Sequence, residues 1–228
     1  MFTAASYNIK CGQDTDFDFA PIGCDLQAVK ADIAGIQEVD RLTKRNKNTD
    51  TMPVLCEKAA LHYHSFAAAM PYKGGHYGIG CLSRFELLTS CTEALPGGAG
   101  FEPRVFMSSK VDIGGKQLCF VNTHLSYENT DIQKKQMEAL GCYLRALNIP
   151  FVLTGDFNTE DFSMFDKLAV PVKLMNNPDS RFPSFYPGNS AIDNIVISDG
   201  LRFIKTGMYT GSQNSDHYMI YAQIEFEK

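Results

Sequence analysis

The chain has no tryptophan, no Cys-x-x-Cys pair and no apolar run long enough to cross a membrane. Its seven cysteines are odd in number, and several lie inside apolar runs, such as Cys119 in QLCFVNTHL. These features exclude a disulfide scaffold and a Cys-x-x-Cys zinc site, and they are typical of free thiols in a reducing compartment. Because the first residues also lack a signal-peptide pattern, we expect a cytoplasmic protein.

Basic residues are scarce as well. The 228 residues include 26 acidic and 21 basic side chains, the net charge is −5, and no Lys/Arg run is longer than a pair. Proteins that bind phosphate backbones usually have a basic balance or a basic face, so nucleic acid is not the favoured partner. The chain also lacks the Gly-x-x-x-x-Gly-Lys-Ser/Thr pattern of a phosphate-binding loop, and we predict that PGGAG (96–100) is a hairpin loop.

No repeat, low-complexity tract or linker divides the chain, so we expect one domain over residues 1–228. Helical patterns are few, and the clearest one begins with Thr130 and Gln133 as a predicted capping box. Many strands with few helices indicate an α/β fold in which sheets face each other and helices lie outside. The predicted helices are 25–32, 51–61, 130–147 and 161–168, and the predicted strands are 2–9, 33–38, 63–68, 77–84, 104–111, 117–125, 149–155, 193–198, 201–208 and 217–226.

The segment LTGDFNTE (153–160) ends an apolar strand with an acid and an amide. Residues two apart in a strand point to the same side, so Asp156 and Asn158 are able to project into one cleft. Gly-Asp and Asn-Thr are also ordinary turn formers, and an acid and an amide in a turn need no function. The segment alone therefore leaves both interpretations open.

Other apolar strands also end or begin with polar side chains. Because strand ends gather at one edge of a sandwich, such groups are expected to converge. A polar residue at one strand end could arise by chance, but six such strand ends favour a functional site over isolated turns. The residues, besides Asp156 and Asn158, are Asn8, Glu38, His124, Asp193, Asp216 and His217.

This set of side chains is rich in oxygen ligands. Glu38, Asp156 and Asp216 offer carboxylates, and Asn8 and Asn158 offer amides. Such a set suits Mg²⁺ or Mn²⁺ rather than Zn²⁺, which prefers histidine and cysteine. The two histidines and the remaining acid are available for proton transfer and anion contact. The combination predicts metal-assisted attack of water on a phosphoester.

In this order, the segments N…QE…THL…GDFN…ID…SDH resemble the endonuclease/exonuclease/phosphatase superfamily, which includes DNase I-like nucleases, sphingomyelinases and inositol polyphosphate 5-phosphatases. The resemblance spans Asn8 to His217, and the bacterial members annotated only as family hydrolases are the most similar. It implies a four-layer α/β sandwich, with two mixed β-sheets packed face to face and helices outside.

The resemblance also implies a role for each residue of the set. Glu38 would be the principal ligand of Mg²⁺ or Mn²⁺, assisted by Asn8 and Asp216. The catalytic residues would be Asp156 and His217, which share the proton-transfer role, Asp193, which orients the histidine, and Asn158 and His124, which contact the phosphoryl oxygens.

Three further residues are candidates for substrate contact. Tyr77 precedes a strand in the way that family members use to line the cleft, and Arg41 and Arg104 suit bidentate recognition of oxygens. A surface salt bridge is an equally good explanation for each arginine. Two positions depart from the family pattern, because many relatives have Arg where this chain has Ala191 and an aromatic residue where it has Asn194.

The acidic balance and the absence of a long insertion favour a small phosphorylated substrate or a lipid headgroup, as a phosphomonoester or a phosphodiester. A nuclease using the same site is the alternative, and it would need a basic, aromatic-bearing groove. An inactive scaffold or binding module is a third hypothesis, but every polar residue that the chemistry needs is present.

Overall fold

The computed structural model describes residues 1–227, and its strands form two six-stranded sheets. The first sheet has the order β11-β12-β1-β2-β4-β3 and the second β5-β6-β7-β8-β10-β9. Both sheets are mixed, since β1 pairs in parallel with β2 and β7 with β8, whereas the other pairs are antiparallel. The strands are β1 (Phe2–Asn8), β2 (Ile33–Arg41), β3 (Tyr63–Tyr72), β4 (Gly75–Ser83), β5 (Thr89–Ala94), β6 (Val105–Asp112), β7 (Gln117–His124), β8 (Phe151–Asp156), β9 (Val172–Leu174), β10 (Asp193–Ser198), β11 (Leu201–Tyr209) and β12 (Met219–Phe226).

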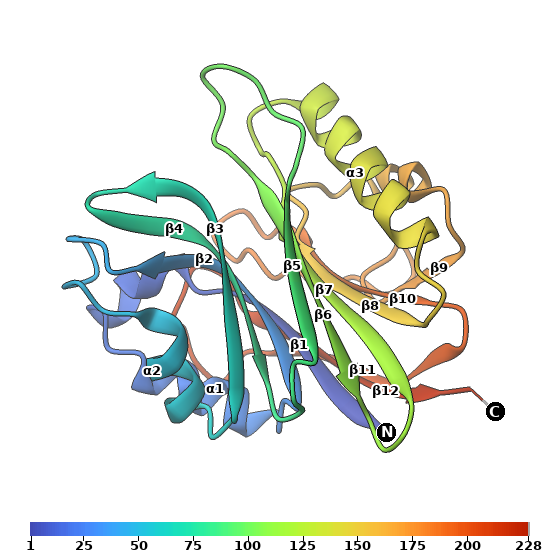
Figure 1. Ribbon diagram of the computed structural model, residues 1–228, viewed down its shortest axis with the longest axis horizontal. Helices are drawn as coiled ribbons and strands as arrows, with labels where there is room; N and C mark the ends of the chain where they lie inside the picture. The colour runs from blue at the N-terminus through green and yellow to red at the C-terminus, as the bar shows by residue number, and fades with distance from the viewer. Residues whose placement is uncertain (228) are drawn as a thin grey trace.

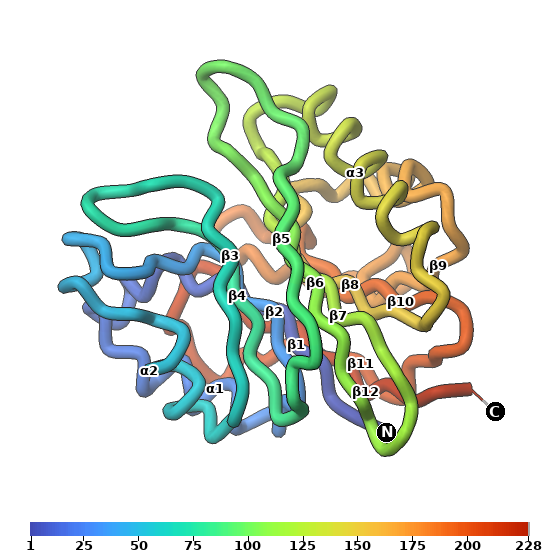
Figure 2. Tube along the Cα trace, viewed as in Figure 1, coloured from blue at the N-terminus to red at the C-terminus, as the bar shows by residue number. Residues whose placement is uncertain are grey.

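Helices cover the outer faces of the two sheets, which makes four layers and confirms the predicted fold (Figure 1). The first sheet carries α1 (Ala20–Ala28) and α2 (Thr51–Lys58), and the second carries α3 (Thr130–Arg145). Two short 3-10 helices, η1 (Lys10–Thr15) and η2 (Phe162–Leu168), lie in the connections. The start of β1 and the end of β12 lie side by side on adjacent strands at the same end of the molecule, as Figure 2 shows.

Three apolar clusters hold these layers together. The central cluster fills the space between the sheets and includes Ile33, Phe120 and Val152. The outer clusters pack α1 and α2 on the first sheet and α3 on the second. Each large side chain that is fully buried contributes about 1.5–3 kcal/mol, so these clusters are the main source of stability. No helix within residues 1–227 has the length and apolar character needed to span a membrane.

A polar layer joins the two sheets next to the cleft. Asn122 of β7 donates to the carbonyls of Ile36 and Gly80 at 3.0 and 2.9 Å and accepts from Gln37 Nε2 at 2.7 Å. The close approach requires glycine at position 35, because a Cβ there would lie 2.1 Å from Thr154 Oγ1. Because these buried hydrogen bonds join the two sheets, they favour one alignment of the sheets, although Gln37 Oε1 has no hydrogen-bond partner within residues 1–227.

The structure also corrects some of the predicted elements. The strands β5 and β9 were not predicted, because β5 is exposed along its whole length and β9 has only three residues. The helix predicted over 25–32 is α1, which begins earlier at Ala20 and ends at Ala28. The predicted capping box is wrong, because Asn129 caps α3 by accepting from two backbone N–H groups. PGGAG does lie in the loop that joins β5 to β6.

Candidate active site

The acid and the amide of LTGDFNTE lie at the end of β8 and in the turn that follows it. Asp156 Oδ1 accepts the backbone N–H of Asn158 at 3.0 Å, which closes the turn. Asn158 has a φ of +52° and donates its side-chain amide to the Leu125 carbonyl at 3.0 Å. Both side chains also line one cleft, where Asp156 is almost fully buried. The segment is a turn, and the turn brings both groups into the cleft.

Asn8, at the end of β1, connects the acidic residues of the two sheets. Its amide nitrogen donates to Glu38 Oε1 at 3.1 Å and to Asp156 Oδ2 at 3.0 Å. Its amide oxygen accepts the backbone N–H of Lys10 at 3.1 Å. Because a backbone N–H is only a donor, this contact fixes which end of the amide faces the carboxylates. Asn8 therefore positions two carboxylates with its N–H groups, and its role as a metal ligand beside Glu38 stays a prediction.

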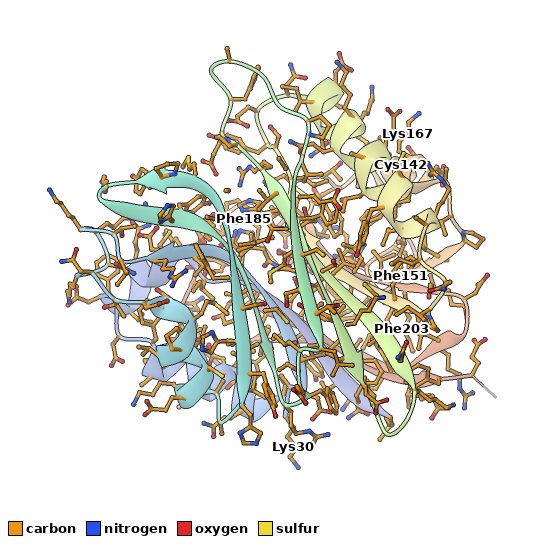
Figure 3. All side chains as sticks on the ribbon, viewed as in Figure 1. Lys30, Cys142, Phe151, Lys167, Phe185 and Phe203 are labelled. Atoms are coloured by element: carbon orange, nitrogen blue, oxygen red, sulfur yellow. The ribbon has the colours of Figure 1, made fainter. Side chains whose placement is uncertain are left out.

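His217 is held by a buried carboxylate. Its Nδ1 lies 2.7 Å from Asp193 Oδ2, and the same oxygen accepts the hydroxyl of Ser184 at 2.5 Å. The Phe185 ring packs 5.0 Å from the imidazole, and Figure 3 labels this phenylalanine. The geometry is that of a histidine whose ring is oriented by an acid, as the resemblance implied for Asp193. Ser184 is not part of the motif, and no pattern in the sequence predicts this contact.

Asp156 lies between two histidines. Its Oδ2 is 3.5 Å from His124 Nε2, at the end of β7, and 3.7 Å from His217 Nε2. Asp156, Asp193 and His217 bring potential ligand atoms within 4.8 Å of one another. In this group Asp193 Oδ2 already accepts from Ser184 and contacts His217, whereas Asp193 Oδ1 has no hydrogen-bond partner within residues 1–227. We interpret the contacts of Asp193 Oδ2 as a hydrogen-bonded network that orients His217.

The two histidines have opposite electrostatic environments. Burial and the Arg104 guanidinium hold the pKa of His124 well below its usual value. Burial also opposes charge on His217, but Asp193 and Asp156 raise the pKa of that imidazole to about 10. Burial, with the nearby Asp193, raises the pKa of Asp156 to about 7. One histidine is therefore neutral and the other cationic on either side of the same acid.

Glu38 enters the cleft through a β-bulge. The pairing of β2 with β4 shifts register between Ile36 and Val39, and Glu38 within this shift has a φ of +54°. The left-handed conformation costs about 1–2 kcal/mol for a residue with a Cβ, and bulges commonly re-aim a side chain next to a site. The half-buried Glu38 carboxylate lines the cleft as a result.

This end of the cleft fits a divalent cation. Burial raises the pKa of Glu38, the Asn8 hydrogen bond opposes this, and the nearby Asp216 carboxylate raises it further. Lys10 partly offsets the negative charge, with Nζ 3.4 Å from Asp216 Oδ2. Two neighbouring carboxylates offer oxygen ligands, and their negative charge is only partly compensated by Lys10. Such a pair suits Mg²⁺ or Mn²⁺. Glu38 and Asp216 are the residues that would hold the ion.

The cleft has a volume of about 450 Å³ and opens at the edge where the strand ends meet. Tyr77 and Arg104 line it, as expected for substrate contacts. Arg41 does not, because its side chain pairs with Asp50 at 3.1 Å and lies over the Phe66 ring. The residues lining the cleft are Glu38, Arg45, Met70, Tyr72, Tyr77, Glu102, Arg104, His124, Tyr127, Asp156, Asn158, Phe185, Ile192, Asp216 and His217.

Arg104 is a buried cation with few partners. Its Nη1 lies 3.0 Å from Glu102 Oε1, on the loop between β5 and β6. Its buried Nε has no hydrogen-bond partner within residues 1–227, and neither has His124 Nδ1. A buried guanidinium with unused N–H groups at a cleft wall is ready to bind an anion. This arrangement agrees with the predicted role of Arg104.

Two glutamines of α3 hold the loops around the cleft. Gln133 Nε2 donates to the carbonyls of Ser126, Phe157 and Asn158 at 3.1, 2.8 and 3.0 Å. Gln136, one turn further on, accepts the backbone N–H of Ser126 at 2.8 Å. Gln133, the glutamine of the predicted capping box, therefore fixes the turns that carry the catalytic candidates.

A second anchor holds the loop before Asp216 and His217. Asp25 of α1 is buried, and its carboxylate accepts hydrogen bonds from Ser212 at 2.7 Å and Asn214 at 2.9 Å. The anchoring residue is distant in sequence from both loop residues. No local pattern therefore points to this contact.

The two departures from the family pattern have local explanations. Asn194 exchanges hydrogen bonds with the backbone of Asn176, accepting its N–H at 2.9 Å and donating to its carbonyl at 2.7 Å. The backbone N–H of Ala191 donates to Glu160, which also pairs with Arg181. Both positions thus stabilise loops beside the site, and neither removes a group that the cleft presents.

One protein-family model matches most of the chain. It is that of the Endonuclease/Exonuclease/phosphatase family, and it covers residues 5–217. No curated protein sequence matches the chain.

Solved structures resemble the chain over almost its whole length. Three of them each have 18% sequence identity and cover 99% of this chain. An endonuclease/exonuclease/phosphatase from Beutenbergia cavernae has a TM-score of 0.81, with 71% of its own chain covered. One from Bacteroides vulgatus has a TM-score of 0.80 with 99% covered, and the Bacteroides thetaiotaomicron mannosyl-6-phosphatase has 0.71 with 100% covered. At this identity the likeness shows the shared fold.

Proposed function

The chain belongs to the endonuclease/exonuclease/phosphatase family, and we propose that it is a metal-dependent phosphoesterase that hydrolyses a small phosphomonoester. The observation that carries the proposal is the position of Asp156 between His124 and His217, at 3.5 and 3.7 Å. An acid flanked by one neutral and one charged imidazole provides a proton acceptor and hydrogen-bond donors in one place. Such a group suits a reaction in which water is deprotonated beside a negatively charged centre.

In the proposed reaction, water attacks phosphorus in line with the ester oxygen, a new P–O bond forms and the ester P–O bond breaks. Asp156 takes a proton from the water, and the His217 imidazolium gives a proton to the departing alcohol. The proton on Asp156 then passes to His217 across the 3.7 Å that separates them, which restores the starting state. Asp193 holds the imidazole in place throughout, at 2.7 Å from Nδ1.

The remaining groups bind and stabilise the phosphoryl oxygens. His124 and Asn158 offer N–H donors, and the Arg104 guanidinium offers charge from the cleft wall. A divalent cation held by Glu38 and Asp216 would supply Lewis-acid stabilisation of the charge that develops on the oxygens of phosphorus. Preorganised donors of this kind often give the largest single contribution to catalysis.

The volume of the cleft and the charge of the chain support a small substrate. A volume of about 450 Å³ lies within the range of small-molecule pockets. The chain as a whole has a net charge of −5. This charge opposes a long phosphate backbone. One protein of the same fold is named a mannosyl-6-phosphatase, which is compatible with a phosphomonoester.

The test compares p-nitrophenyl phosphate with bis(p-nitrophenyl) phosphate in Mg²⁺, in Mn²⁺ and in EDTA. We expect metal-dependent release that favours the monoester and is lost in His217→Ala. Exclusive hydrolysis of the diester would replace the proposal with a nuclease or a phospholipid-type activity, and plasmid nicking at several salt concentrations would separate these two. Absence of both activities together with absence of metal binding would support an inactive scaffold.

A further inference from the structure

Arg45 reaches the cleft from the loop that follows β2 and is held there rigidly. Its Nε and Nη2 each lie 2.7 Å from an oxygen of Asp40, which is fully buried. Nη2 also donates to Cys11 Sγ at 3.0 Å, and this sulfur lies 3.9 Å from Glu38 Oε2. Asp40 and Cys11 thus hold the guanidinium in place. The Cys11 thiol lies between Arg45 and Glu38, a predicted ligand of the cation.

Two tyrosines adjoin this guanidinium at the cleft wall. Arg45 lies 4.5 Å from the centre of the Tyr72 ring and 6.0 Å from that of Tyr77, and the two rings are 6.4 Å apart. Lys73 is also over the Tyr72 ring, at 5.2 Å. Arg45 and Lys73 already lie over the Tyr72 ring, which leaves less of the ring face for a stacked base. A ligand here is therefore bound more readily by hydrogen bonds to the guanidinium and the tyrosine hydroxyls.

Asp40 compensates the charge of Arg45, and Lys73 adds a cation on the Tyr72 ring but does not line the cleft. The bidentate contact with Asp40 compensates the Arg45 guanidinium, while Nη1 has no hydrogen bond to any described residue. Arg45 therefore offers N–H donors with little net charge, and the tyrosine hydroxyls are able to donate and to accept. The exposed lysines nearby, Lys44 and Lys73, do not line the cleft. Such a surface favours hydroxyl groups over a second anion.

We propose that Arg45, Tyr72 and Tyr77 form a leaving-group subsite that binds an uncharged, hydroxylated ring, such as a sugar, beside the scissile phosphate. The inference rests on the proposed phosphomonoesterase function and specifies its substrate class. The sequence analysis does not indicate Arg45 or Tyr72, because the residues it predicts for substrate contact are Arg41, Tyr77 and Arg104.

The test measures kcat/KM for mannose 6-phosphate and glucose 6-phosphate relative to phenyl phosphate. The same panel includes a hexose 1,6-bisphosphate and adenosine 5′-monophosphate. We expect the wild-type protein to prefer at least one hexose 6-phosphate over phenyl phosphate by tenfold or more. Preference for the bisphosphate would indicate a second anion site, and preference for the nucleotide would indicate a base site. Either result overturns the proposal.

Variants then test whether the preference for a hexose phosphate depends on the proposed subsite. Tyr72→Leu, and the double variant Asp40→Asn with Arg45→Gln, should each lower the ratio of hexose phosphate to phenyl phosphate at least tenfold. The double variant avoids leaving the buried Asp40 unpaired. Arg84→Gln is the matched control, because Arg84 is exposed, pairs with Asp32 and lies outside the cleft. An unchanged ratio in both variants would refute the subsite.

The outcomes separate this inference from the function on which it rests. Hydrolysis of phenyl phosphate without any preference for a hexose phosphate leaves the phosphomonoesterase in place and removes the subsite. Absence of hydrolysis of every monoester overturns both.

Discussion

Replacing Asp25 with alanine should destabilise the protein and slow hydrolysis together, although Asp25 does not line the cleft. Its buried carboxylate accepts three hydrogen bonds, from Tyr7, Ser212 and Asn214, at 3.0, 2.7 and 2.9 Å. The last two hold the loop that leads into Asp216. Without them, the loop loses its link to α1, while the Ser215 hydroxyl, 2.7 Å from the Asn8 carbonyl, remains as an anchor.

The size of both effects follows from these contacts. A hydrogen bond to a charged group contributes about 1.5–3 kcal/mol, and the lower end applies because Ser212 and Asn214 are only half-buried. We therefore expect Asp25→Ala to lower the free energy of unfolding in urea by about 3–5 kcal/mol. Small displacements of a catalytic group cost up to about a hundredfold in rate, and since one anchor remains we expect about a tenfold loss of kcat.

Tyr7→Phe is the matched control for this prediction. It removes the third hydrogen bond to Asp25 but leaves both contacts with the loop, so it should cost about 1.5 kcal/mol and leave kcat unchanged. A variant Asp25→Ala that is destabilised as expected yet keeps the wild-type kcat would show that the loop is positioned without α1. That result would refute the reasoning.

Three further predictions concern the site itself. Glu38→Gln should weaken Mg²⁺ or Mn²⁺ binding at least tenfold in calorimetry and abolish turnover; unaltered binding would exclude Glu38 as a ligand. Asp193→Asn should reduce stability most at pH 6.5 and below, because a raised pKa of His217 stabilises the fold there and this contribution is lost as the pH rises through about 10. Urea titrations across that range should show the deficit shrinking, and a constant deficit would contradict the pairing. Gln133→Met should lower kcat and stability because three carbonyls lose their donor, whereas the exposed Lys135→Met should change neither.

The fold could be predicted because its strands are apolar and buried. Every predicted strand overlaps a strand of the structure, and the stripe of α3 packs Met137, Leu140 and Leu144 against the second sheet. The pattern failed where burial is absent, as in the exposed β5, or where the element is too short to show a period, as in β9. Hydrophobic periodicity reports burial, so an edge strand without a buried face gives no such signal.

The residues that carry the chemistry of the site could be predicted better than the residues that hold its loops in place. Six of the eight polar strand-end residues line one cleft, because the strand ends meet at one edge. Asn8 and Asp193 do not line it and instead hold Asp156 and His217 by hydrogen bonds. Orientation could not be predicted from the motif, since a backbone N–H decides which end of the Asn8 amide faces the carboxylates. Supporting residues such as Asp25 act over long sequence separations and have no fixed spacing from the motif.

The position of Asn8 explains why the site needs residues from both halves of the chain. Asn8 and Glu38 belong to the first sheet and Asp156 to the second, so the hydrogen bonds of one amide cross the interface between the sheets. The distance between these carboxylates therefore depends on how the sheets are aligned. Gln37, the residue before Glu38, and Asn122 help to fix that alignment with a buried hydrogen bond of 2.7 Å. Because a polar contact in the core tolerates little sliding, the same layer that specifies the fold also sets the geometry in which water and phosphate would meet.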